Sequence, residues 1–119
     1  MKFIVKKPIP GFENVQEVDF SKIDIDLAVL KDGEKTLFTL INPFILREYE
    51  FEIPADVKVL LDINENSKIE VYNNIVLKNP REESIVNFKA PFIFNFDNNT
   101  CAQVILGNEG YSKLGDFVK

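Results

Sequence analysis

Short runs in which apolar and polar residues alternate recur along the chain, and residues that favour turns separate them. Such runs predict β-strands, because successive side chains of a strand point to opposite faces of its sheet. The Asp32-Gly33 step between two apolar runs predicts a hairpin, and Asp97-Asn98-Asn99 predicts the turn of another. Strands are expected over residues 1–6, 15–26, 27–30, 36–41, 48–53, 68–77, 85–90, 92–96 and 100–106, with a bulge at 73–74.

One segment has the spacing of a helix instead. Pro54 suits the first turn of a helix, and Val57, Leu60 and Leu61 recur at helical spacing. Many short strands and a single helix indicate a mainly all-β fold, a small antiparallel β-barrel-like domain with one short helix. A length of 119 residues fits a single domain over residues 1–119.

The stretch from Asn87 to Leu106 combines a proline with a β-rich run. Proline cannot donate to a sheet ladder, so Pro91 predicts an edge, a bulge or a corner. Beyond it, Phe92, Phe94 and Phe96 share one strand face. An aromatic stripe can stack nucleic-acid bases, but such platforms carry interleaved Lys and Arg, which are missing here. We therefore expect these rings to form a core.

Composition argues against catalysis. The chain has no His, one Cys and no glycine-rich phosphate loop, so the commonest general base and the usual zinc ligands are missing. We expect a protein without enzymatic activity, cofactor or metal. The lone Cys101 and the lack of a long apolar run favour a cytoplasmic protein that does not enter the membrane.

The formal net charge of -5 bears on the partner. Direct nucleic-acid binding usually needs a basic face, so a basic protein is the better match. Glu48, Glu50 and Glu52 alternate with apolar residues and share one face of an expected strand. This stripe is interpreted as a solvated face that blocks edge pairing, or as a docking strip for a cationic partner. A calcium site is disfavoured, because neighbours two apart on a strand diverge.

Polar side chains within the apolar C-terminal half form a second group of candidates. They are Asn87, Lys89, Asn95 and Gln103. Buried amides must find hydrogen-bond partners, so these residues either fix the fold or display polar groups on a binding face. Asn87, Lys89 and Gln103 join Glu48, Glu50 and Glu52 as candidate partner-binding residues.

Several segments, taken in order, resemble the FliW family of flagellar assembly factors, and together they run through most of the chain. The segments are Pro10–Glu13, Phe38–Pro43, Tyr49–Pro54, Asn87–Pro91 followed by Asn95, and Gln103–Leu106 with Tyr111.

The resemblance implies a small β-barrel-like protein without catalytic activity that binds two proteins in turn. One is CsrA, an RNA-binding translational repressor that the family inhibits allosterically, and the other is flagellin, whose binding excludes CsrA. The resemblance thus implies a regulator of flagellin synthesis and flagellum assembly. Two alternatives remain open from the residues: a small barrel that binds single-stranded nucleic acid, and a carrier with an enclosed apolar cavity for a small ligand.

Overall fold

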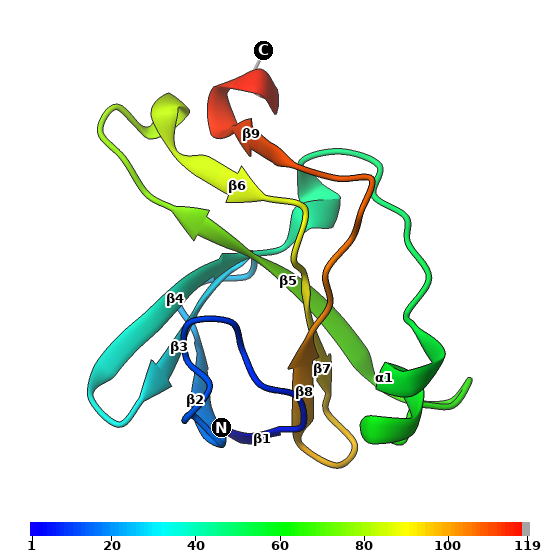
Figure 1. Ribbon diagram of the computed structural model, residues 1–119. Coiled ribbons are helices and arrows are strands. Elements are labelled where there is room, and N and C mark those ends of the chain that lie inside the picture. Colours follow the sequence, from blue (N-terminus) through cyan, green and yellow to red (C-terminus); the bar gives the residue numbers. More distant parts are fainter. Residues whose placement is uncertain (118–119) are drawn as a thin grey trace.

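The computed structural model describes residues 1–117. Its strands are short, and both tight turns and longer connections link them, as Figure 1 shows. The strands are β1 (Lys2–Val5), β2 (Glu17–Lys22), β3 (Leu27–Asp32), β4 (Lys35–Ile41), β5 (Ile69–Val76), β6 (Ile85–Asn87), β7 (Phe92–Asn95), β8 (Thr100–Gln103) and β9 (Tyr111–Lys113). The helix is α1 (Ala55–Leu60), and the 3₁₀ turns are η1 (Pro43–Ile45), η2 (Arg81–Glu83) and η3 (Leu114–Phe117).

Within these residues seven strands close a barrel in the order β4-β3-β2-β1-β8-β7-β5, with β4 and β5 completing the circuit. The expected mainly all-β barrel with one short helix is confirmed. The expectation of a purely antiparallel barrel is wrong at one seam, because β1 and β8 pair in parallel. No hairpin joins these strands, which lie at opposite ends of the sequence, so no turn dictates their relative direction.

β5 connects the barrel to a smaller sheet. Its first half pairs with β7, Asn73 and Asn74 pair with the end of β4, and its last residues pair with β6, which in turn pairs with β9. The bulge expected at residues 73–74 is therefore wrong. The two asparagines mark the place where β5 changes partners. Figure 1 shows β5 running from the barrel to the strands of the smaller sheet.

The two expected hairpins form. β3 and β4 meet at Gly33, whose φ of 62° lies in the left-handed region that glycine adopts without strain. β7 and β8 meet through a turn in which Asn99 has a φ of 55°. Asparagine tolerates this conformation better than most residues, which explains the choice of turn residue.

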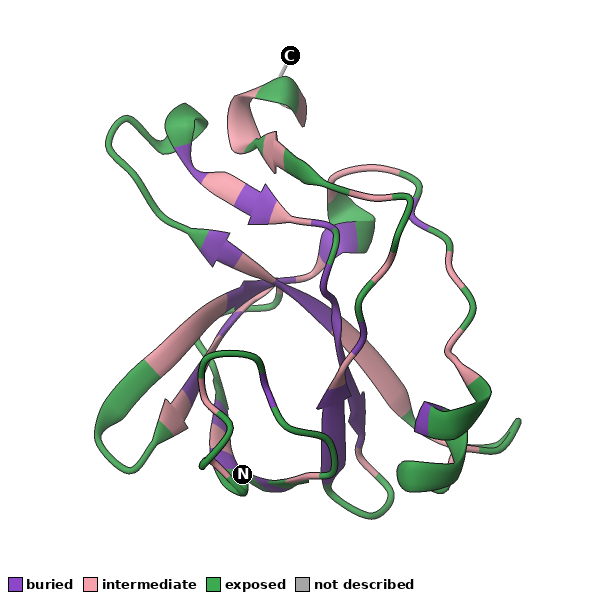
Figure 2. Cartoon of the chain, in the orientation of Figure 1, coloured by how far each residue is buried: buried purple, intermediate pink, exposed green. Residues whose placement is uncertain are grey.

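Aromatic rings fill the barrel. Phe92 and Phe94 are fully buried, and Phe96 packs against the same core cluster. Ring centroids of Phe94 lie 5.1 Å from Phe3 and 5.0 Å from Phe20. The core interpretation of the aromatic stripe is confirmed, so these rings are unavailable for base stacking. Figure 2 shows the buried colour concentrated on β7 and β8.

The strand expected at residues 48–53 is wrong, since the segment has no strand partner within residues 1–117. Buried and exposed side chains nevertheless alternate along this segment. Tyr49 is buried, Phe51 and Ile53 are half-buried, and the three glutamates between and before them are exposed. Alternation reports which side of an extended chain faces the core, and a covering segment meets that condition as well as a strand does.

Two smaller expectations also need correction. Leu60 of α1 is exposed, whereas Val57 and Leu61 are fully buried against the outer face of the barrel. The strand expected at 85–90 ends at Asn87, whose Oδ1 accepts a hydrogen bond from the backbone N–H of Lys89 at 2.9 Å. Residues 1–117 contain no helix with the length and apolar character needed to cross a bilayer.

Replacing Phe94 by alanine tests the core directly. The ring is fully buried, so Phe94→Ala is expected to lower the free energy of unfolding by about 3–5 kcal/mol, through lost transfer energy and a residual cavity. Urea denaturation followed by circular dichroism measures the change. Ile25→Ala is the matched control, because Ile25 is 83% exposed and should change stability by less than about 0.5 kcal/mol. A comparable loss of stability in both variants would contradict the assignment of Phe94 to the core.

Candidate partner-binding site

Two glutamates of the stripe, Glu50 and Glu52, line an open groove of about 530 Å³. A neighbouring hollow of about 290 Å³ shares Phe44 and Val71 with it. We call the two together the β5 groove. Its lining residues are Asn42, Phe44, Tyr49, Glu50, Phe51, Glu52, Ile53, Ile69, Glu70, Val71 and Tyr72.

One wall of the groove is the extended segment 48–53. Phe51 and Ile53 pack with Val71 on the outer face of the barrel, around Ile93 and α1. Because these side chains turn toward the protein, the alternate side chains of Glu50 and Glu52 turn outward at the rim. Glu48 is exposed on the same segment but does not line the groove.

A buried hydrogen-bond network fixes this wall. The hydroxyl of Tyr49 donates to the backbone oxygen of Phe88 at 2.6 Å. Asn73 Nδ2 donates to the Tyr49 hydroxyl at 3.2 Å and to the backbone oxygen of Asn87 at 2.8 Å. Burial raises the pKa of Tyr49, which keeps the hydroxyl protonated and able to donate. The strand that changes partners therefore also anchors the groove wall.

Arg47 secures the start of the same wall. Its guanidinium carbon lies 4.1 Å from the ring centroid of Phe88 and 5.4 Å from that of Tyr49, and the side chain forms an ion pair with Glu109. A stacked and paired arginine holds the segment to the 104–110 connection more firmly than an exposed ion pair would. The sequence analysis missed this residue, since its acidic partner is 62 positions away.

The charge on the groove is concentrated at Glu50 and Glu52. Glu70 accepts a hydrogen bond from the Tyr72 hydroxyl at 2.7 Å and pairs with Lys22 at 3.5 Å. Burial, together with this hydrogen bond, raises the pKa of Tyr72. By contrast, Glu50 and Glu52 have no ion-pair partner within residues 1–117 and are exposed. They are available to a cationic ligand.

The second group of candidates lies elsewhere. Asn87, Lys89 and Gln103 gather around the connection between β6 and β7, where Gln103 Nε2 donates to the backbone oxygen of Ala90 at 3.2 Å. Asn95 is buried and donates to the backbone oxygen of Leu61 at 2.8 Å. These bonds support a fold-fixing role for the amides. A role of Asn87, Lys89 and Gln103 in partner contact stays a prediction.

The groove offers groups that can bind another molecule. Among the described residues no three His, Cys, Asp or Glu side chains converge as a metal site. Cys101 is buried in the barrel core, where burial raises the pKa of its thiol to about 12 and leaves it protonated and unreactive. The groove instead offers apolar surface with an anionic rim.

Comparisons with known proteins agree on one family. The FliW protein family model matches residues 2–114. The chain is 50% identical over 117 residues to flagellar assembly factor FliW 2 of Wolinella succinogenes, covering 97% of this chain and 86% of that protein. It is 42% identical over 127 aligned positions to FliW 1 of the same organism, covering 100% and 99%.

Two further matches extend the comparison. The flagellar assembly factor FliW of Sulfurimonas denitrificans is 50% identical over 108 residues, which cover 89% of this chain and 86% of that protein. A crystal structure of the flagellar assembly factor FliW superposes with a TM-score of 0.86, covering 95% of this chain and 84% of the other at 22% identity. At that identity the superposition shows the fold alone.

Burial of Cys101 gives stability a pH dependence. The folded thiol keeps its proton up to about pH 12, whereas the unfolded thiol ionises near pH 9.0. A pKa raised by folding contributes stability that is complete below the unfolded value and is lost as the pH rises above it. Relative to Cys101→Ala, the wild-type protein should therefore lose about 1 kcal/mol of stability between pH 8 and pH 10. Urea titrations at both pH values measure this, and equal pH dependence in the two proteins would contradict the burial.

Proposed function

Since this chain belongs to the FliW family of flagellar assembly factors, we propose that it regulates flagellin synthesis by binding a CsrA-like translational repressor and flagellin in turn. It acts in the cytoplasm through its surface, without chemistry of its own. The observation that carries the proposal is the β5 groove, an apolar surface on the barrel whose rim carries two carboxylates without an ion-pair partner in residues 1–117.

The charge of the chain supports the CsrA-like partner. A protein that binds RNA carries a basic surface, and a net charge of -5 attracts such a surface over several ångströms. Complementary charge speeds encounter and selects against acidic partners. The exposed Glu48, Glu50 and Glu52 concentrate this charge on one segment. The long-range attraction brings the two proteins together, whereas the contact itself lies away from the RNA-contacting surface of the repressor, which makes the inhibition allosteric.

The apolar part of the groove supports a second protein partner. Phe44 is 51% exposed although it is a large aromatic residue, and it borders both hollows of the groove. An apolar surface framed by polar groups is typical of protein recognition sites. Flagellin that accumulates in the cell occupies the protein and frees the repressor, whereas export of flagellin returns the protein to the repressor.

A competition titration tests the switch. Calorimetry of the purified chain with the CsrA-like protein and with flagellin from the same organism should show saturable binding of each. When the chain is saturated with flagellin beforehand, titration of the repressor should release no heat of binding, because the two partners exclude each other. A basic protein unrelated to flagella, such as hen lysozyme, controls for unspecific charge attraction. If neither partner binds, the proposal is wrong, and if both bind together, the exclusion is wrong.

The carboxylate stripe has its own test. Glu48→Gln, Glu50→Gln and Glu52→Gln made together should weaken CsrA binding roughly tenfold at low salt, since each exposed charge contributes about 0.5 kcal/mol. The loss should shrink at high salt because ions screen exposed charges. The matched control changes Glu34, Glu65 and Glu82 to Gln, three carboxylates that are exposed elsewhere. Equally weakened binding in both variants would show that only net charge matters, and the interpretation of the stripe as a docking strip would then be wrong.

A further inference from the structure

β5 has an edge that no strand of the barrel covers. β4 lies on that side of β5, but its pairing reaches only Leu40 with Asn74 and Ile41 with Asn73. Beyond Ile41 the chain turns away into η1, where Asn42 Oδ1 accepts a hydrogen bond from the N–H of Phe44 at 3.0 Å. Pro43 has no N–H with which to continue the ladder. Within residues 1–117, residues 69–72 of β5 are thus left without a strand neighbour on this side, where only the η1 turn lies close.

The ladder between β5 and β7 shows which backbone groups point to the uncovered edge. The N–H of Phe96 donates to the oxygen of Lys68 at 2.8 Å, so Lys68 bonds toward β7. Backbone groups of an antiparallel strand point alternately to its two sides. Glu70 and Tyr72 therefore bond toward β7, whereas the N–H and C=O groups of Ile69 and Val71 face the other side. Within residues 1–117 these groups have no strand partner.

This edge borders the β5 groove. Val71 lines both hollows of the groove, and Ile69 lines the smaller one. The opposite wall is the extended segment 48–53, whose backbone also has no strand partner within the described part of the chain. Between them lie apolar side chains, and Glu50 and Glu52 stand at the rim. The groove therefore combines free backbone donors and acceptors with apolar surface and negative charge.

We propose that the β5 groove binds an extended segment of a partner protein, which adds as a strand to Ile69–Val71 and carries Lys or Arg alternating with apolar residues. A helix bonds its own backbone groups internally, whereas an extended segment has N–H and C=O groups that can pair with those of Ile69 and Val71. Alternation then sends apolar side chains into the groove and cationic ones toward Glu50 and Glu52. This mode of binding goes beyond the partner switch and does not depend on which protein supplies the segment.

A defined peptide tests the proposal without either partner. The probe is a capped seven-residue peptide of alternating lysine and valine, titrated at low salt into the ¹⁵N-labelled full chain and followed by nuclear magnetic resonance. The amide signals of Ile69 and Val71 should move, and their hydrogen exchange should slow. A second peptide carries N-methyl groups on the alternate backbone nitrogens that would face β5. It cannot donate hydrogen bonds to the strand and should bind at least tenfold more weakly.

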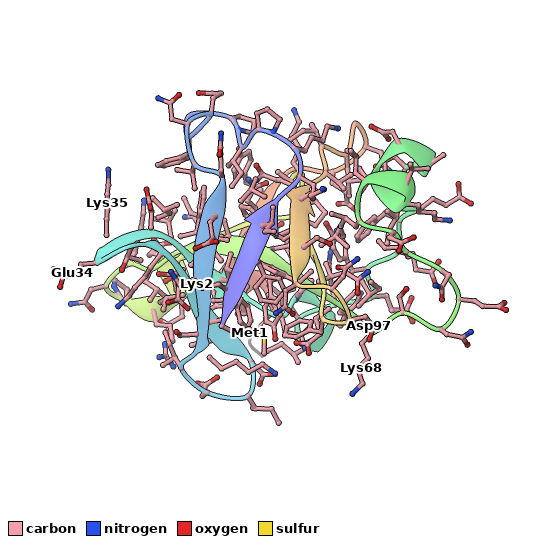
Figure 3. The ribbon with its side chains drawn as sticks, turned by 90° about the horizontal axis from the view of Figure 1, so that it is seen from below. Met1, Lys2, Glu34, Lys35, Lys68 and Asp97 are labelled. Atoms are coloured by element: carbon pink, nitrogen blue, oxygen red, sulfur yellow. The ribbon has the colours of Figure 1, made fainter. Side chains whose placement is uncertain are left out.

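Charge reversal provides a matched pair of variants. The double variant Glu50→Lys, Glu52→Lys should lower the affinity for the peptide at least tenfold. The double variant Glu34→Lys, Glu65→Lys makes the same change of net charge and should lower that affinity less than threefold. In Figure 3, Glu34 lies at the far tip of the β3–β4 hairpin, on the opposite side of the molecule from Lys68, which precedes β5. Equal weakening by both pairs would overturn the proposed charge contact.

The direction of the backbone groups can be tested separately. Val71→Pro removes an N–H that faces the groove, so it should lower the affinity for the peptide and leave the protein folded. Glu70→Pro removes an N–H of the β7 ladder and should unfold the protein or destabilise it far more. If Val71→Pro also unfolds, the charge-reversed variants and the methylated peptide still decide the outcome. Shifts confined to residues outside the groove, or tighter binding by a helical peptide of the same composition, would overturn the proposal.

Discussion

The closure of the barrel through β5 is the constraint on which the rest of the structure depends. β5 pairs with β7, then with β4, then with β6, so one strand holds the barrel and the smaller sheet together. The contact with β4 is short, because Asn42 and Pro43 end that strand. At the crossing, the side chain of Asn73 also holds Tyr49 and the backbone of Asn87. The same short closure that completes the barrel leaves part of its edge uncovered beside the groove.

Local features of the fold were readable from the sequence, and long-range ones were not. Gly33 and the Asp97–Asn99 turn identified two hairpins, because turn chemistry depends only on neighbouring residues. Residues 48–53 were misread as a strand, since burial on alternate sides does not reveal whether a neighbour supplies hydrogen bonds. The parallel pairing of β1 with β8 was equally invisible, because the two strands are far apart in the sequence and no turn connects them directly.

The candidate site follows the same division. Glu50 and Glu52 were found from their alternation, and the structure places both at the rim of the groove. Phe44 and Val71 come from separate elements and meet only in three dimensions, so no pattern could join them. Asn87, Lys89 and Gln103 stand out in the sequence for their polarity. The side-chain amides of Asn87 and Gln103, however, form hydrogen bonds with the backbone of the β6–β7 connection. A polar residue in apolar sequence signals a constraint without saying whether that constraint is structural or functional.

The central claim is that the protein acts through the β5 groove by surface complementarity. Hydrogen exchange of the full chain, measured alone and in complex with the CsrA-like protein, tests that claim most directly. The account predicts that the complex slows exchange in residues 48–53 and 69–71, which lie on the two sides of the groove. Slowed exchange confined to residues 87–91 and 103, with the groove unchanged, would contradict it and move the binding surface to the β6–β7 connection.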